Sequence, residues 1–248
     1  MPIVKNELRP YTNAFFEDME PGALRSARVV LPLILDLLSP ASILDVGCGR
    51  GAWIRAAMEL GIQDAYGVDG DYVDPDTLLI PRGHFQTADL SRPFEVPRQY
   101  DLALCLEVAE HLPKRAAVPL IDSLTAASPA VLFSAAIPGQ TGTYHINEQF
   151  PEFWYRLFSE KDYVPVDAVR PRIAFDARVE PWYAQNILLY VSRTFLDDEA
   201  RLRGCQLINH PDRLLPWIHS EIWRGRLTWR GCLSLCRIVL ARGFRPNG

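Results

Sequence analysis

The chain has 248 residues and a formal net charge of −4, and 48% of its residues are hydrophobic against 23% charged. This apolar content is enough for one full hydrophobic core, so we expect one principal domain with a small appendage. The negative charge disfavours a protein that grips nucleic acid by neutralising phosphates, and the sequence has no run of about 18 uncharged apolar residues to span a membrane.

The first hundred residues alternate between helical and extended patterns. Apolar residues recur at helical spacing over about 22–38, and Pro40 then stops the helix. A second helix is predicted over about 53–60, closed by Gly61. Short buried strands are predicted at 43–46, 65–68, 84–87 and 100–106. Such alternation predicts a mostly parallel sheet, with the functional site at the carboxyl ends of its strands.

Regular elements continue through the second half of the chain. The aromatic segment 151–159 is predicted as a helix because Pro151 suits its first turn, and 182–186 is predicted to open the last strand or close a hairpin. The remaining elements are a helix around 120–124 and strands at 130–136, 163–169 and 186–191. Seven strands therefore predict an α/β domain over 1–192 and leave 193–248 as a helical C-terminal extension.

A glycine turn follows the first strand and opens a helix. Gly47, Gly49 and Gly51 let the backbone approach a ligand closely and free backbone amides to face it. Their spacing is Gly-x-Gly-x-Gly, which differs from the Gly-x-Gly-x-x-Gly of dinucleotide-binding enzymes. Asp45 stands two residues before the first glycine, where it would repel a pyrophosphate but can serve a cofactor that carries an ammonium and a sulfonium.

Two more acidic residues follow neighbouring strands. Asp69 ends the second strand, where a carboxylate can accept both hydroxyls of a ribose. Asp89 follows the third strand, where its side chain can meet an adenine amino group. Each acid alone is equally well explained as a helix cap or a loop residue. Three acids at three successive strand ends together predict a site for an adenosine that carries a cationic tail.

The chain resembles the class I S-adenosylmethionine (SAM) dependent methyltransferases through the motifs at 45–51, 67–70, 88–90 and 100–112. The resemblance implies a Rossmann-like, seven-stranded, mostly parallel sheet with an antiparallel last strand, SAM as cofactor and S-adenosylhomocysteine (SAH) as product. Cys48 is then a small spacer, because methyl transfer from a sulfonium is a direct displacement, and Trp53 packs on the cofactor or on the sheet. The implied cofactor-binding residues are Asp45, Gly47, Cys48, Gly49, Trp53, Asp69, Gly70, Asp89, Leu90, Leu106 and Glu107.

A Glu-x-x-Glu-His motif, formed by Glu107, Glu110 and His111, follows the fourth strand. Many methyltransferases of this class have a similar motif, whose first residues line the methionine end of the cofactor. In the small-RNA 2′-O-methyltransferases a similar set holds magnesium together with a later histidine, and His145 is the candidate here, although it comes sooner. Such ligands suit magnesium or manganese. The alternative is that Glu110 and His111 only organise the start of a helix.

The segment 143–154 stands where such enzymes place an acceptor loop, and His145 in it is a possible general base. The stretches 133–149 and 182–186 resemble a bacterial methyltransferase group that modifies glycans and natural products. This resemblance implies O-methylation of a sugar or another hydroxylated small molecule, with Glu107, His111 and His145 as the catalytic candidates. An N- or C-methyltransferase, an RNA 2′-O-methyltransferase and a non-catalytic SAM-binding partner subunit remain alternatives.

The C-terminal extension 193–248 is basic, with ten arginines against five acidic residues, and it contains Trp217, Trp223 and Trp229. We interpret it as a helical segment that packs on the domain or forms a homodimer; the alternative is a surface for nucleic acid or an anionic membrane. Five scattered cysteines form neither a disulfide framework nor a paired zinc signature. Charged residues among the first ten do not suit a signal peptide, so we expect a cytoplasmic protein.

Overall fold

Seven short strands form one sheet in the computed structural model, which describes residues 11–140 and 142–205. The strand order across the sheet is β3-β2-β1-β4-β5-β7-β6. Neighbouring strands run parallel, except that β7 is antiparallel to both β5 and β6. The predicted sheet with an antiparallel last strand is thus confirmed. The strands are β1 Ser42–Val46, β2 Asp64–Asp69, β3 Phe85–Thr87, β4 Leu102–Leu106, β5 Ala130–Ser134, β6 Tyr163–Val166 and β7 Leu188–Ser192.

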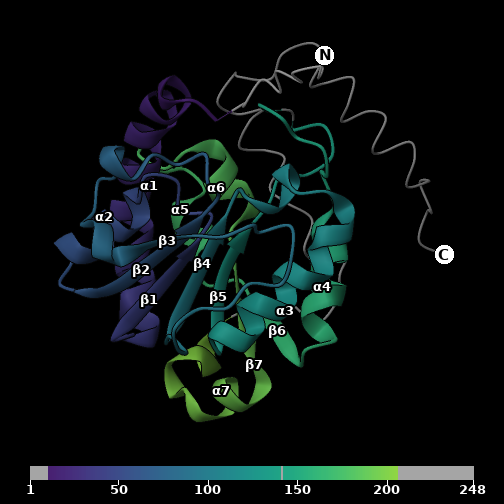
Figure 1. The fold of residues 1–248 in the computed structure, drawn as a ribbon. Helices are drawn as coiled ribbons and strands as arrows, with labels where there is room; N and C mark the ends of the chain where they lie inside the picture. Colours follow the sequence, from purple (N-terminus) through teal and green to yellow (C-terminus); the bar gives the residue numbers. More distant parts are fainter. Residues whose placement is uncertain (1–10, 141, 206–248) are drawn as a thin grey trace, which may run out of the picture.

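Helices cover both faces of this sheet (Figure 1). The helices α1 and α2 lie together on one side, and α3 and α4 lie on the other. The short helices α5 and α6 precede β7, and α7 follows it. The helices are α1 Asn13–Leu38, α2 Ala52–Glu59, α3 Ala117–Ala127, α4 Pro151–Ser159, α5 Arg170–Ile173, α6 Pro181–Asn186 and α7 Arg193–Asp198.

Alternating side chains of the central strands build a separate core on each face. Ile43 of β1 packs with α1 and α2, whereas its neighbour Leu44 packs with α3 and α4. In β4, Leu104 likewise packs with α1 and α2, and Cys105 packs with α3 and α4. Both faces are buried because successive side chains of a strand point to opposite sides. The sheet is therefore fixed between two apolar layers, and its carboxyl-terminal edge is held rigidly for a site.

The first helix begins earlier than the sequence predicted. The predicted start near Gly22 is wrong, because α1 begins at Asn13 with Thr12 as its N-cap and continues through Pro21. A Pro-Gly pair is a typical stop signal, but the helix continues here, with Glu20 paired to Arg50 and Gly22 lying against Glu180. Nine more residues of α1 are thereby brought over the carboxyl ends of the strands.

The segment before the last strand also differs from the prediction. Residues 182–186 were predicted to open that strand or to close a hairpin, but they form most of α6. Pro181 occupies the first turn of this helix, where its fixed φ and missing N–H are tolerated. The strand then begins at Leu188. As a result Gln185 and Asn186 are buried beside the carboxyl end of β4 rather than paired along the sheet.

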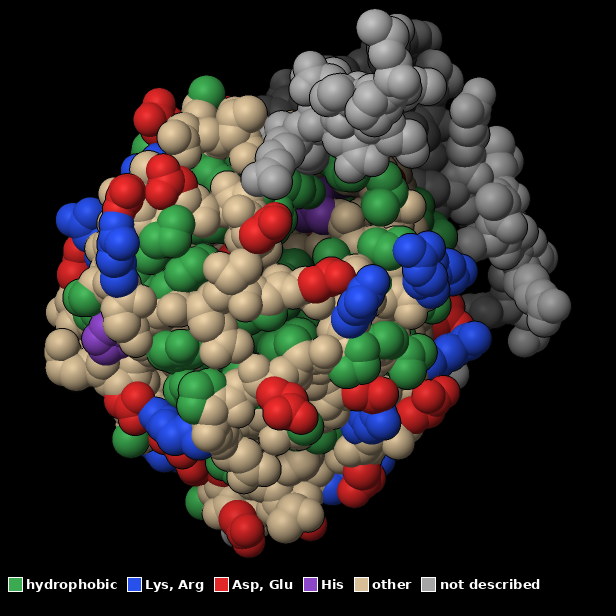
Figure 2. Space-filling model, in the orientation of Figure 1, with side chains coloured by type: hydrophobic (Ala, Val, Ile, Leu, Met, Phe, Trp, Pro, Cys, Tyr) green, Lys and Arg blue, Asp and Glu red, His purple; other side chains and the backbone are tan. Residues whose placement is uncertain are grey.

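Most of the predicted C-terminal extension, including its three tryptophans, lies outside the described residues, as do Cys232 and Cys236. The expectations of a homodimer and of a nucleic-acid or membrane surface rest on that part of the chain. Within the described part, none of the helices has the length and apolar character needed to cross a membrane. Figure 2 shows acidic and basic side chains interspersed over one face, without a large area of one sign.

Candidate active site

The glycine turn after β1 adopts backbone conformations that suit glycine. Gly47, Gly49 and Gly51 have φ angles of +79°, +54° and +91°, in the left-handed region that L side chains rarely adopt. A Cβ at Gly47 would also lie 2.3 Å from a methyl carbon of Val108. The turn therefore has no room for side chains, and it leaves open the space above the ends of β1 and β2.

Two adjoining cavities lie at this edge of the sheet, with volumes of about 350 Å³ and 620 Å³. The smaller one extends toward α6, and Asp45, Trp53 and Tyr183 line it. The larger one lies over β2 and β3, and Asp69 and Asp89 line it. Six residues line both cavities and mark their junction: Phe15, Phe16, Gly47, Gly49, Glu107 and His111.

Asp69 lies in the wall of the larger cavity with its carboxylate buried. It accepts hydrogen bonds from the backbone N–H groups of Gly49 and Gly70, both at 2.6 Å, and from the Tyr72 hydroxyl. Burial raises the pKa of Asp69, and these donors oppose the rise. The carboxylate is thus held at the glycine turn by donors on both sides, in the position from which the sequence predicts contact with a ribose.

Asp89 lies in the outer part of the larger cavity and is 58% exposed. Its carboxylate accepts bonds from the Ser91 hydroxyl at 2.6 Å and the Ser91 backbone N–H at 3.0 Å, and these bonds lower its pKa. The neighbouring Leu90 is buried and lines the same cavity. The structure therefore brings both predicted adenosine-binding residues to the larger cavity, with Asp69 at its floor and Asp89 at its rim.

Asp45 is a buried carboxylate in the smaller cavity, and its Oδ2 atom has no hydrogen-bond partner. Burial, together with the charge of Asp69, raises its pKa to about 8. An unpaired buried carboxylate is costly, and a bound cation would remove that cost. Trp53 lies in the same wall, with its ring edge-on to Tyr183 at 5.2 Å between centroids. Its side chain both packs in the core and lines the cavity.

Cys48 lies in the glycine turn and is buried, and burial raises the pKa of its thiol well above the ordinary value. A thiol held in its neutral form is a poor nucleophile. Its sulfur would instead lie 2.7 Å from a Cβ built at Gly67, so it fills the space left by that glycine. This placement agrees with the prediction that Cys48 is a small spacer.

Glu107 follows β4 at the junction of the two cavities, with a left-handed φ of +56°. Its Oε1 accepts a bond from the Asn186 side-chain amide and its Oε2 one from the Gln140 side-chain amide, both at 3.1 Å. Gln140 in turn accepts bonds from Asn186 at 2.9 Å and from Gln185 at 3.3 Å. Side chains from two distant segments therefore fix one carboxylate at the junction.

Glu110, His111 and His145 form a cluster whose possible ligand atoms all lie within 4.8 Å of one another. Burial and the charge of Glu107 raise the pKa of Glu110 well above its ordinary value, and burial lowers that of His111 to about 4. The two imidazole rings lie edge-to-face with centroids 4.9 Å apart. His145 Nδ1 lies 3.0 Å from a carboxylate oxygen of Glu148. Glu107, predicted as a fourth metal ligand, is not in this cluster because its oxygens accept amide N–H groups.

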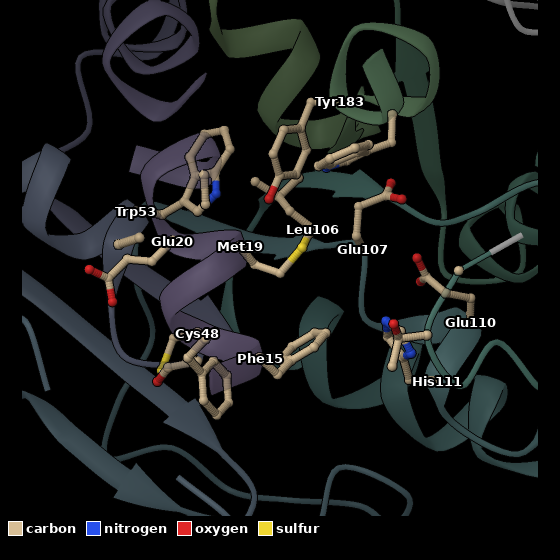
Figure 3. A pocket seen from close by; sticks show the side chains of 18 of the residues that line it. Phe15, Met19, Glu20, Cys48, Trp53, Leu106, Glu107, Glu110, His111 and Tyr183 are labelled. Carbon is tan, nitrogen blue, oxygen red and sulfur yellow. The ribbon is translucent and has the colours of Figure 1, made fainter. Parts of the chain in front are cut away.

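The N-terminal part of α1 contributes cavity residues that the sequence analysis missed. Phe15 and Met19 project from α1 into the middle of the cavity, with Trp53 and Tyr183 on one side and Glu110 and His111 on the other (Figure 3). The spacing of residues 15, 19 and 23 is helical, and Thr12 is a good N-cap, so the sequence does contain a pattern for a helix that starts near residue 13. The Pro-Gly pair that follows instead indicates a helix end, and the pattern was therefore not recognised.

Tyr11 and Tyr72 are two further cavity residues that the sequence analysis missed. Their rings lie 4.8 Å apart over the larger cavity, and the Tyr11 ring also meets His111 edge-on. Gly70 provides the space for Tyr72, because a Cβ there would lie 2.2 Å from its ring. No periodic pattern marks either tyrosine in the sequence, since both lie outside the regular elements.

A family model described as a methyltransferase domain matches residues 16–162 of the chain. No curated protein matches it. Among solved structures, a candidate O-methyltransferase from Nostoc punctiforme aligns with a TM-score of 0.55 and 17% identity over 72% of this chain and 59% of that one. Human N-acetylserotonin methyltransferase in complex with SAM aligns with a TM-score of 0.51 and 15% identity, over 72% of this chain and 55% of that one.

The methyltransferase domain of a bacterial Hen1 protein aligns with a TM-score of 0.51 and 16% identity, over 68% of this chain and 98% of that domain. At these identities the likeness concerns the fold. The chain spans less than two thirds of the Nostoc and human proteins, so their remaining parts have no counterpart in the alignment.

Proposed function

The chain belongs to the methyltransferase-domain family, and we propose that it is a SAM-dependent enzyme that methylates a hydroxyl oxygen of a small molecule. The observation that supports oxygen as the acceptor atom is the pair formed by His145, which lines the smaller cavity, and Glu148, whose carboxylate oxygen lies 3.0 Å from His145 Nδ1. An alcohol must lose its proton as it takes a methyl group, and a histidine oriented by a carboxylate is suited to accept that proton.

The cavities fit the shape and charge of SAM. When bound, SAM supplies an electrophilic methyl group on a sulfonium. The buried, unpartnered oxygen of Asp45 suits the ammonium of the methionine end, and Asp69 suits the ribose hydroxyls. Gly47 and Gly49 line both cavities, and a Cβ at either position would strain a left-handed backbone and press on Val108 or Phe16. We assign these residues, with residues 1–192 as the domain that carries them, to cofactor binding.

In this proposal His145 accepts the acceptor hydroxyl proton, and Glu148 fixes the orientation of its ring and stabilises the imidazolium that forms. Glu148 is itself held by the backbone N–H of Gly139 at 2.8 Å. His111 stays neutral near pH 7, because its pKa is about 4. The His111 ring, which lies beside the His145 ring, therefore does not oppose the new positive charge on His145. Glu107 and His111 complete the catalytic group at the junction.

The acceptor class that the cavity favours is an uncharged ring with hydroxyl groups, such as a sugar. Phe15, Met19 and Trp182 provide an apolar wall on which a ring can stack. Glu110 and His111, which line the same cavity, provide polar partners for hydroxyl groups. A cavity of about 350 Å³ accommodates a small molecule or one residue of a larger glycan. The proposal places the enzyme in glycan or natural-product modification.

A second candidate is metal-assisted O-methylation, which the cluster of Glu110, His111 and His145 favours. One carboxylate and two imidazoles are acceptable ligands for magnesium or manganese, and the ion would lower the pKa of a bound hydroxyl. Activity lost in a chelator and restored by added magnesium or manganese would support this version. Activity that persists in the chelator would leave His145 as the base.

The test is a screen of labelled methyl transfer from SAM to neutral glycosides, nucleosides, phenols and amines. We expect transfer to a hydroxyl group, and His145→Ala should slow it about 100-fold or more while retaining SAM binding. His84→Gln is the matched control, because His84 ends the short 3₁₀ helix just before β3 and lines neither cavity. Full activity of the His145 variant, or transfer to nitrogen or carbon alone, would contradict the proposal.

A further inference from the structure

Glu107 is the one carboxylate among the described residues that line both cavities. Asp45 lies in the smaller cavity and Asp69 in the larger one. If the ammonium end of SAM meets Asp45 and its ribose meets Asp69, the sulfur that joins these two ends lies at the junction. Glu107 is therefore placed to meet the part of the ligand that carries the sulfonium charge.

Burial raises the pKa of Glu107, and the hydrogen bonds that its carboxylate accepts oppose this rise and fix its orientation. Its two oxygens accept one N–H each, from Asn186 and Gln140, and amide N–H groups stabilise a carboxylate rather than a carboxylic acid. Its backbone N–H is bound to the hydroxyl of Ser134 at 3.1 Å, which anchors the residue to the end of β5. The left-handed φ of +56° carries a steric cost, and such costs persist where the surrounding structure fixes the residue.

We propose that Glu107, oriented by Gln140 and Asn186, recognises the sulfonium charge and makes the site prefer SAM to SAH. This inference rests on the proposed use of the two cavities for SAM. The two ligands share the adenosine and the amino acid end, and they differ at sulfur, which is cationic in SAM and neutral in SAH. A fixed negative charge at the junction lowers the free energy of the SAM complex alone. Product leaves more readily as a consequence.

The two carboxylates assigned to the ends of SAM do not make this distinction. Asp45 and Asp69 face the ammonium and ribose ends that both ligands possess, so they strengthen both complexes alike. Discrimination between the two ligands is therefore assigned to Glu107, with Gln140 and Asn186 as positioning residues.

The experiment measures the dissociation constants of SAM and of SAH by titration calorimetry for the full chain and its variants. We expect Glu107→Gln to lower the ratio Kd(SAH)/Kd(SAM) about tenfold or more. Asn186→Ala, which leaves the carboxylate but removes one donor, should lower the ratio about threefold. Asp45→Asn is the matched control: it should weaken both ligands and change their ratio less than about twofold.

A ratio that stays constant in Glu107→Gln, while both ligands still bind, would overturn the inference and leave the use of SAM intact. If Glu107→Gln does not fold, the variants Asn186→Ala and Gln140→Ala provide the test. A ratio Kd(SAH)/Kd(SAM) that stays constant in both variants would also overturn the inference. Wild-type protein that binds neither ligand would refute the cofactor site itself and this inference with it.

Discussion

Replacing Asp45 by asparagine should stabilise the ligand-free protein and weaken its binding of SAM. Asp45 is buried, and its Oδ2 atom has no hydrogen-bond partner. Its pKa is raised from 3.8 to about 8 by burial and by the charge of Asp69. Asparagine keeps the shape of the side chain and removes the carboxyl group that has to be protonated or desolvated on folding.

The magnitude of this stabilisation follows from the pKa of Asp45. The folded protein retains a proton that the unfolded chain releases between about pH 4 and pH 8, so the free energy of unfolding of the wild type falls as pH rises through this window. A tenfold change in proton affinity corresponds to about 1.4 kcal/mol. The gain in Asp45→Asn is then at most about 4 kcal/mol at pH 7 and roughly 1.5 kcal/mol at pH 5.

Thermal unfolding followed by circular dichroism at both pH values measures this gain. For a chain of this size, about 4 kcal/mol raises Tm by roughly 10 °C. Calorimetry should show SAM binding weakened about 10- to 100-fold, because a charge-assisted hydrogen bond is lost. Asp101→Asn is the control, since Asp101 already accepts bonds from Ser42 and the Ala41 backbone N–H and should give no gain. A Tm that does not rise, or rises equally at both pH values, would refute the reasoning.

Three other substitutions test the site and the core. Asp69→Ala should weaken SAM binding about tenfold or more through lost ribose bonds, and an unchanged affinity would contradict the assignment. Gly142→Ala would place a Cβ 2.3 Å from His145 Nε2, and it should slow methyl transfer while SAM affinity is retained. The control Gly83→Ala, whose Cβ would meet nothing within 4 Å, should not slow methyl transfer. Equal rates for the two variants would argue against His145 as the base. Phe158→Ala should lower the free energy of unfolding by about 3–5 kcal/mol in urea titrations, because Phe158 is fully buried and stacks on Tyr190 at 3.9 Å; a loss below about 1 kcal/mol would contradict this packing.

The glycine turn and the acids beside it were predictable because their chemistry is local. Gly47 and Gly49 are required by backbone conformations that few other residues adopt, and Asp45 and Asp69 stand at fixed offsets from them. The structure places all four around two adjoining cavities. The strands were predictable for the same reason, since short apolar runs bounded by glycine or proline indicate buried strands.

Contacts between distant segments could not be predicted in this way. Glu107 is bound by Gln140, 33 residues later, and by Asn186, 79 residues later, and no local pattern encodes those pairs. The early start of α1 was missed because a local stop signal at Pro21 is outweighed by contacts with distant residues, such as Arg50 with Glu20 and Glu180 beside Gly22. Asn186 was assigned to a strand for a similar reason, since its helix is a single short turn opened by Pro181.

The sequence by itself determined the order of the seven strands, the glycine turn and the acids at the strand ends, because each depends on residues close together in the chain. Only the tertiary structure decided which side chains share the cavities: Phe15 and Met19 from α1, the amides around Glu107, and the meeting of Glu110 with His145. Those contacts form because the sheet and its two apolar layers bring remote segments of the chain together. That arrangement is set by packing across the whole domain.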